Sequence, residues 1–401
     1  MSLSALSAAC GPGDSSSAVA ATWCYADAHA VPVAFTPADD PGAWNRAGRS
    51  QPRFVELWRA GGLNANEQLA FPLNAAASAS GRLAIADWML QTLVVVEPDG
   101  DWTTWMRPGE GPGELARPGA VVWAGDTDTL AVYDLDNSRI VFAWEGRPAR
   151  PDLLVLPAFT SSLMAAGEIR WLGVLPDGGV VAAPVPPTNP NADEAYVSAP
   201  APILHLAPGS ASVDTVGLVQ LPTIPRIGLT APGWPKSVAA VSSGGMLAVG
   251  GTTSSYSIRR LDAAGRSTDV ICRSSSALPL EGRELQAPAD ANPRLDSLAR
   301  SLASAPRPDS LAPYGRLFFS GDGQLWVQRE RPAALRFGDS YHGVPGALYD
   351  VFDADGRYLG EVRAPANARL QAALGDTVWA YEIGELDETW VVAYELRWEE
   401  E

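Results

Sequence analysis

Short hydrophobic runs bounded by turn residues recur six times along this chain. The runs begin at Leu83, Leu130, Val180, Leu247, Leu325 and Val378, which lie 47, 50, 67, 78 and 53 residues apart. Short runs of this kind between Gly-, Asp- and Pro-containing turns indicate buried β-strands. Repeats of about 40–50 residues with several strands in each are typical of β-propellers. We therefore expect an all-β fold, a six-bladed β-propeller.

Each repeat is expected to supply four strands. In the second repeat these strands are Ala120–Trp123, Leu130–Tyr133, Arg139–Trp144 and the weaker Leu153–Leu156. Steps of the Asp-x-x-Gly kind, such as Asp262–Gly265, separate strands elsewhere. Because glycine readily adopts the positive φ that a tight hairpin turn requires, these steps predict hairpins.

The last repeat lacks its fourth strand. Arg369–Leu374, Thr377–Tyr381 and Trp390–Trp398 supply three strands before the chain ends. A missing outer strand would leave an open sheet edge. Phe54–Trp58 precedes the first repeat and has the composition of a strand. We therefore expect this N-terminal strand to close the last blade, so that residues 51–401 form the propeller and residues 1–50 form a signal remnant or tether with an extended segment.

The longest loops are expected on one face of the disc. Because strands alternate in direction, second-to-third loops and blade-to-blade crossings share a face, and the insertions 184–201 and 273–313 fall there. Variable loops on a rigid scaffold commonly present binding surfaces. The candidate partner-binding residues on this face are Trp234, Pro186, Pro187, Leu295 and Leu298.

The charge balance excludes some partners. The chain has 29 Lys and Arg against 46 Asp and Glu, a net charge of −17, and its basic residues are not clustered. Binding to nucleic acid requires clustered cations, so nucleic acid is not expected as a partner, and anionic lipid headgroups are not expected either. No run of about 18 apolar residues occurs, so no transmembrane span is predicted.

The N-terminal region contains a candidate lipidation site. Leu6–Cys10, followed by a stretch rich in Gly, Pro and Ser, is similar to the end of a bacterial lipoprotein signal peptide and its tether. Only nine residues precede Cys10, too few for a charged start and an apolar stretch of about 7–15 residues. A start site further upstream would explain this. Cys10 is therefore either a lipid attachment site or a chance cysteine in a tail.

If Cys10 carries lipid, Cys24 and Cys272 remain as an even pair. An oxidising compartment would allow them to form a disulfide, and the alternative is two free thiols. The two cysteines are therefore the disulfide candidates of this chain.

Candidate catalytic chemistry is scarce. The only histidines are His29, His205 and His342. Asp134 and its neighbours lack the ligand spacing of a calcium loop, so these acids are expected to bind turn amides instead. We single out no catalytic, cofactor-binding or metal-ligating residue.

One motif resembles a known group. Gly109–Leu115, with Pro118 after it, resembles the Gly-x-Gly-Pro-Gly-Glu-Phe…Pro signature of bacterial six-bladed propellers related to the NHL-repeat proteins, with Leu115 in place of the Phe. The resemblance covers about residues 54–398. It implies the propeller fold and an envelope or exported protein, so we expect a location in the periplasm or cell envelope, with Cys10 as the candidate lipid anchor.

Two classes of function follow. The favoured one is a noncatalytic exported propeller that binds a protein on its loop-rich face, as a scaffold or accessory subunit of a membrane-associated envelope assembly such as a respiratory or photosynthetic one. The elaborated face and the absence of a catalytic signature favour it. The alternative is a metal-dependent propeller hydrolase or lactonase with a carboxylate-lined channel.

Overall fold

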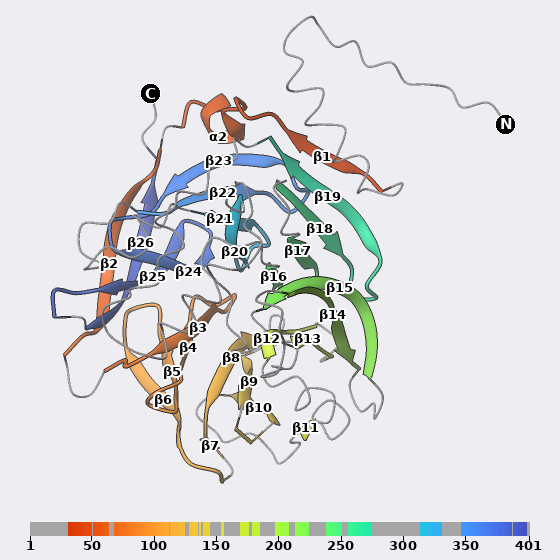
Figure 1. Cartoon of the computed structure of the whole chain (residues 1–401). Helices are drawn as coiled ribbons and strands as arrows, with labels where there is room; N and C mark the ends of the chain where they lie inside the picture. Colours follow the sequence, from red (N-terminus) through yellow and green to blue (C-terminus); the bar gives the residue numbers. More distant parts are fainter. Residues whose placement is uncertain are drawn as a thin grey trace, which may run out of the picture.

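The protein is a ring of six antiparallel sheets in this computed structural model (Figure 1). The structure describes residues 31–49, 51–63, 68–111, 113–124, 128–134, 136–137, 139–144, 154–155, 169–175, 179–184, 197–207, 213–223, 238–250, 256–274, 313–330, 346–386 and 388–398. The expected all-β, six-bladed propeller is confirmed.

The first three blades follow the chain order. Their strands, given from the axis outward, are β3 (Pro72–Ala77), β4 (Leu83–Asp87), β5 (Thr92–Val96), β6 (Trp102–Pro108) and β7 (Glu114–Leu115) in blade 1; β8 (Pro118–Trp123), β9 (Thr129–Asp134), β10 (Arg139–Trp144) and β11 (Leu154–Val155) in blade 2; and β12 (Ile169–Val174), β13 (Val180–Pro184), β14 (Val197–Leu206) and β15 (Val213–Thr223) in blade 3.

The other three blades include strands from the N-terminal region. Their strands are β16 (Val238–Val241), β17 (Leu247–Gly250), β18 (Tyr256–Leu261), β19 (Ser267–Arg273) and β1 (Val33–Thr36) in blade 4; β20 (Tyr314–Phe319), β21 (Leu325–Arg329), β22 (Leu348–Phe352) and β23 (Tyr358–Arg363) in blade 5; and β24 (Ala368–Leu374), β25 (Thr377–Ile383), β26 (Thr389–Arg397) and β2 (Arg53–Gly61) in blade 6.

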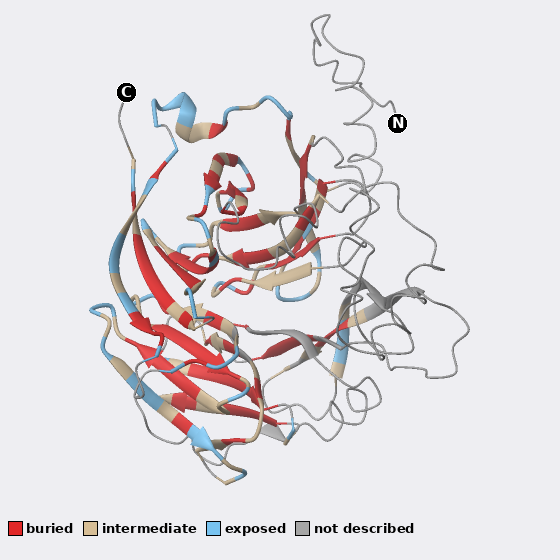
Figure 2. Ribbon diagram, turned by 60° about the vertical axis from the view of Figure 1, so that its left-hand side comes forward, coloured by how far each residue is buried: buried red, intermediate tan, exposed pale blue. Residues whose placement is uncertain are grey.

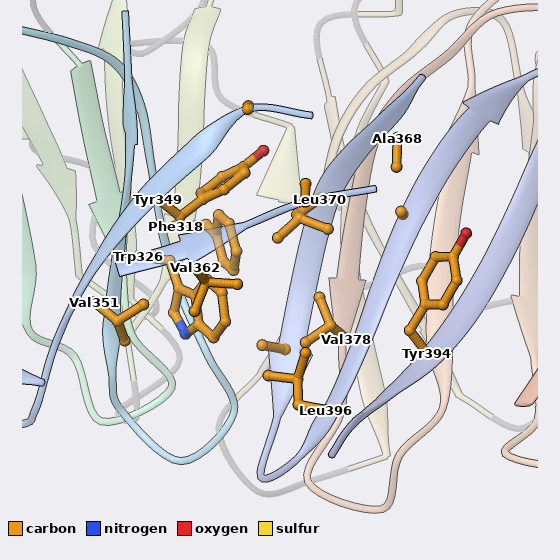
Figure 3. Packing of buried hydrophobic residues seen from close by; sticks show 14 of the residues in the cluster. Phe318, Trp326, Tyr349, Val351, Val362, Ala368, Leu370, Val378, Tyr394 and Leu396 are labelled. Carbon is orange, nitrogen blue, oxygen red and sulfur yellow. The ribbon is translucent and has the colours of Figure 1, made fainter. Parts of the chain in front are cut away.

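The core lies between neighbouring blades. Every residue of the second strands β4 and β17 is buried, and buried residues run through the strands of the ring (Figure 2). Between blades 5 and 6, Trp326 and Tyr349 pack in one cluster with Leu370 and Val378 (Figure 3). Burial of apolar area stabilises such a ring by about 25 cal/mol per Å². The hydrophobic runs of the sequence are therefore the inter-blade contact surfaces.

The N-terminal strand closes the ring, as expected. β2 pairs with β26 in antiparallel register, with Arg53 opposite Arg397 and Phe54 opposite Leu396. The rings of Phe54 and Tyr394 meet edge to face at 5.5 Å between centroids. Blade 6 therefore contains both the start and the end of the propeller.

The segment before β2 covers the rim of two further blades, which the sequence did not predict. β1 pairs in parallel with β19, with Phe35 opposite Cys272. The short helix α2 (Gly42–Arg46) contacts β23, and Trp44 lies over Gly360. Cys272 is fully buried and disulfide-bonded. The N-terminal segment therefore runs along blades 4, 5 and 6 in turn (Figure 1).

We call the side with the second-to-third loops and the blade-to-blade crossings the crossing face. Its described segments are 69–71, 88–91, 109–117, 136–137, 365–367 and 384–386 with 388. The opposite side carries tight hairpins in which Gly100, Gly265 and Gly356 have φ values of 95°, 75° and 81°. These positive φ values explain the glycine of the Asp-x-x-Gly steps.

The insertion expected at 184–201 is shorter than predicted. Residues 197–201 belong to β14, which forms a long hairpin with β15 from Val197 opposite Thr223 to Leu206 opposite Val213. Only Leu204–Leu206 of β14 also pair with β13. Among the described residues, Pro200 and Pro202 therefore lie in the part of β14 that pairs with β15 alone, and proline within sheets is confined mainly to such edges.

Candidate functional site

The crossing face of blade 1 is organised around a buried carboxylate. Asp87, the last residue of β4, is fully buried. It accepts hydrogen bonds from the backbone N–H groups of Ala70 at 2.8 Å, Met89 at 3.0 Å and Leu90 at 2.9 Å, and also from that of Phe71. One side chain therefore ties the crossing into β3 to the loop after β4. Four backbone donors leave this carboxylate no open position for a ligand.

Asp134 has the same role in blade 2. It ends β9, is fully buried, and accepts hydrogen bonds from the backbone N–H groups of Ala116 at 3.1 Å and Arg117 at 2.9 Å. It also accepts from Asn137 and from the guanidinium of Arg139 at 2.9 Å. We call Asp87 and Asp134 the aspartate clamps.

Arg139 links the second clamp to the Gly109–Leu115 motif. Its guanidinium donates to the carbonyl oxygens of Glu110, Gly111 and Glu114. The backbone N–H of Gly111 and the side chain of Arg107 lower the pKa of Glu114 by hydrogen bonding, and the backbone contribution is the larger one. The motif is thus a turn between blades 1 and 2, held by charge from blade 2.

Blades 4 and 5 share a buried ionic network. The fully buried Asp350 of β22 accepts from Arg273 at 2.9 Å and from Arg329 at 2.6 Å. Burial, together with the negative charge of Asp350, raises the pKa of Tyr256 well above its usual value. Arg329 also contacts Glu361 at 2.9 Å. The carboxylate of Asp350 is therefore neutralised by two arginines.

The described residues do not fit a divalent metal. They contain no group of three or more His, Cys, Asp or Glu side chains suited to hold a metal ion. The three buried aspartates already accept from amides or guanidinium groups, whereas Ca²⁺ needs six to eight oxygen ligands. We therefore derive no reaction step through a metal in the described part of the chain.

A different chemistry lies on the inner strands of blades 5 and 6. Arg316 of β20 is half-buried and donates to the carbonyl oxygen of Leu370 at 2.5 Å and to the Gln371 side chain at 2.7 Å. Gln371 is 2% exposed and donates in turn to the carbonyl of Arg369. Arg369 of β24 is exposed. We call Arg316, Arg369 and Gln371 the arginine site.

The arginine site has excess positive charge. Burial lowers the pKa of Arg316 to about 10, and the nearby charge of Arg369 lowers it further in the same direction. Neither guanidinium forms an ion pair with a carboxylate of the described residues. A guanidinium has five N–H donors, and the described residues accept from two of those on Arg316. Two adjacent cations with neutral neighbours are suited to bind an anion.

The arginine site lies at the mouth of the ring's centre on the crossing face. β20 and β24 are the innermost strands of their blades, and both begin at the crossing face. Arg316 and Arg369 stand near the starts of these strands. Tyr381, the pairing partner of Arg369 on β25, donates to the carbonyl of Asn74 in β3 at 3.3 Å. This bond connects the site to blade 1.

Sequence reasoning missed the arginine site. Arg316 lies 53 positions before Arg369 and 55 before Gln371, and it meets them only when blades 5 and 6 pack. The available signal was an arginine within the first three residues of an innermost strand, in Tyr314–Phe319 and again in Ala368–Leu374. Such strands border the channel, so a charged side chain there needs either a bound ligand or a protein group to interact with.

Most candidate residues from the sequence lie outside the described part of the chain. These are Cys10, Cys24, Trp234, Pro186, Pro187, Leu295 and Leu298, along with His29 and His342. The Cys24–Cys272 disulfide, lipidation at Cys10 and a protein partner on the crossing face therefore stay predictions. His205 is half-buried in β14, opposite Asp214 of β15. None of the helices in the described part has the length and hydropathy of a membrane span.

The fold is shared with several solved propellers. A gluconolactonase from Xanthomonas campestris is 15% identical, with 90% of this chain and 97% of that chain covered and a TM-score of 0.46. A calcium-binding regucalcin from Agrobacterium tumefaciens is 12% identical, with 90% and 96% covered and a TM-score of 0.42. A candidate exported protein from Bacteroides fragilis is 10% identical, with 91% and 99% covered and a TM-score of 0.50. No protein family's sequence profile and no curated protein matches the chain.

The comparisons correct the favoured function. The noncatalytic accessory subunit is wrong as the main interpretation, because the similar structures include a gluconolactonase and agree better with the hydrolytic alternative. At these identities the similarity shows the fold alone, so no substrate transfers to this chain. The noncatalytic interpretation rested on the absence of a catalytic motif in the sequence, and residues that meet only through blade packing form no such motif.

Proposed function

We propose that this propeller is a hydrolase of small carboxylic esters or lactones, with the arginine site at the centre of its crossing face. One observation carries the proposal. Arg316 is held in place by Leu370 and Gln371 beside a second cation, with no carboxylate of the described residues to neutralise either one. The reaction class is the hydrolytic alternative weighed from the sequence, without its metal.

The arginines would act on the charge that develops in hydrolysis. The oxygen of water adds to the carbonyl carbon and the carbonyl oxygen becomes negative. The carbonyl then re-forms as the C–O bond to the alcohol breaks, and the departing alcohol oxygen takes up the proton that the water has lost. Donors that are fixed before the reaction stabilise such an oxyanion without reorganisation. Arg316 has this fixed position, and the exposed Arg369 would attract the substrate and retain the carboxylate product.

Kinetics with matched variants tests the proposal. Hydrolysis of γ-butyrolactone, δ-gluconolactone and 4-nitrophenyl acetate should be measured for the wild type, Arg316→Gln and Arg369→Gln. Loss of one oxyanion donor costs about 10²–10³-fold in kcat, so Arg316→Gln should lose about that much. Arg259→Gln is the control, because Arg259 is exposed on β18 and outside the inner strands. Turnover that survives both arginine variants unchanged would contradict the proposal.

We also propose that the protein is exported. Cys272 is disulfide-bonded, and disulfides persist mainly in oxidising compartments. The resemblance of the Gly109–Leu115 motif to NHL-like envelope propellers supports the same location, and lipidation at Cys10 would anchor the chain there. Cell fractionation with Cys10→Ser tests both parts. The wild type should sediment with membranes and the variant should be released. A wild type found in the cytosol with a reduced Cys272 would contradict the proposal.

A further inference from the structure

The crossing face of blade 1 presents exposed apolar side chains. Phe71 is 47% exposed and Met89 is 60% exposed. Trp88, which directly precedes Met89, is half-buried. The rings of Phe71 and Trp88 meet edge to face at 5.7 Å between centroids. The guanidinium of Arg117 lies 5.7 Å from the Trp88 ring. We call Phe71, Trp88 and Met89 the aromatic platform.

The platform is fixed by the first aspartate clamp. Asp87 accepts from the backbone N–H groups of Phe71 and Met89, which belong to two different loops. The backbone N–H of Trp88 donates to the carbonyl of Phe71 at 3.1 Å, which joins the two loops directly. A fully buried carboxylate is thus used to hold exposed apolar residues in one arrangement. Such preorganisation lowers the entropy cost of binding a ligand.

The platform and the arginine site lie on the same side of neighbouring inner strands. Phe71 directly precedes β3, and Asn74 of β3 accepts the Tyr381 hydroxyl. Tyr381 is the pairing partner of Arg369. Phe71 is three positions before Asn74, a span of about 10 Å along a strand. The platform and the pairing partner of Arg369 therefore belong to adjoining strands at the same face of the ring.

We propose that the aromatic platform binds the apolar or aromatic end of the substrate's acyl chain, while the carbonyl end lies at the arginine site. This inference rests on the proposed function and names its substrate class: esters or lactones of arylalkanoic or similarly apolar acids. Continuity with the arginine site is the reason to assign the platform to the substrate and not to a second protein. The apolar chain of such an acid would pack on the aromatic platform, and its anionic end would bind the arginines.

Binding of two product analogues tests the assignment. Isothermal titration calorimetry should compare 6-phenylhexanoate with hexanoate, which has the same carboxylate and chain but no ring. The phenyl group should tighten binding by about tenfold, the usual size of a buried aromatic contact. In Trp88→Ala and Phe71→Ala the two ligands should bind with nearly the affinity of hexanoate to the wild type. Arg316→Gln should weaken both ligands equally.

The control is Leu57→Ala, because Leu57 is 50% exposed on the outer strand β2. It should leave both affinities unchanged. If hexanoate binds through Arg316 but the phenyl group adds nothing, the platform assignment fails and the proposed function stands. If neither carboxylate binds, both fail. A dimer in sedimentation that Trp88→Ala dissociates, with no gain from the phenyl group, would assign the platform to a second copy and overturn the inference.

Discussion

The buried acids of blades 1 and 2 lie at the end of the second strand, whereas the buried acid of blade 5 lies on the third strand. In blades 1 and 2 the second strand ends in Asp87 or Asp134, and each carboxylate holds loop amides. In blade 5 the corresponding position is Arg329, and the acid comes from the third strand as Asp350. The same place in a repeated fold therefore carries either sign of charge. What matters is that a partner of the other sign is supplied from a neighbouring strand or loop.

The difference explains where a ligand can bind. The clamps of blades 1 and 2 leave rigid loops and no spare carboxylate. In blade 5 the single buried acid is occupied by Arg273 and Arg329. None of the described carboxylates therefore neutralises Arg316 and Arg369 on the inner strands. The anion-binding site that we propose therefore lies where the nearby described acids are already paired.

The largest expected effect comes from removing the acid of blade 5. Asp350→Asn leaves the buried guanidinium of Arg273 without a countercharge and leaves Arg329 with Glu361 alone, and breaking a buried ion pair in this way costs about 3–5 kcal/mol. The free energy of unfolding from urea denaturation should fall by that amount. Asp353→Asn is the control, because Asp353 accepts only turn amides in an exposed hairpin. A loss under about 1 kcal/mol for Asp350→Asn would show that blade 5 does not depend on this acid.

The two clamps should differ in strength. Asp87 accepts from neutral amides only, whereas Asp134 also neutralises the buried Arg139. Asp87→Asn should cost about 1–3 kcal/mol, and Asp134→Asn should cost more. Hydrogen exchange should show faster exchange at Phe71 and Met89 in Asp87→Asn only. Equal losses in the free energy of unfolding of the two variants would show that the ion pair with Arg139 adds nothing to the clamp at Asp134.

The smallest expected effect is on the pH dependence of ligand binding. Arg316 is charged below its pKa of about 10, so hexanoate affinity should be constant from neutral pH upward and weaken as the pH rises through that value. Deprotonation removes one of two positive charges, so the direction is a loss of affinity. Arg316→Gln should show no such change over the same range. Affinity that rises above pH 10 would contradict the assignment of Arg316.

The architecture could be predicted from the sequence because strands and hairpins depend on residues that are close together in the chain. Runs such as Leu83–Asp87 and Leu130–Asp134 carry the buried second strands, and Phe54–Trp58 had the composition that closes blade 6. These signals need only neighbouring residues. The role of Asp134 in binding turn amides was expected for the same reason.

The candidate site could not be predicted in this way. Arg316 and Gln371 meet through the packing of two blades, and Phe71 and Met89 come together because Asp87 accepts from the backbone N–H groups of both loops. The surroundings of Arg316 and Arg369 are set by the packing of the closed ring, so the sequence alone does not reveal them.

The pairing of β2 with β26 also determines when the protein can finish folding. Arg53 and Arg397 are partners although they are 344 positions apart. At about 5–20 residues per second, a ribosome needs roughly 20–70 s to deliver the second partner after the first. During that interval the earliest part of the chain must wait unpaired while five blades are synthesised. A chaperone that shields strand edges on this time scale would therefore raise the yield of folded protein.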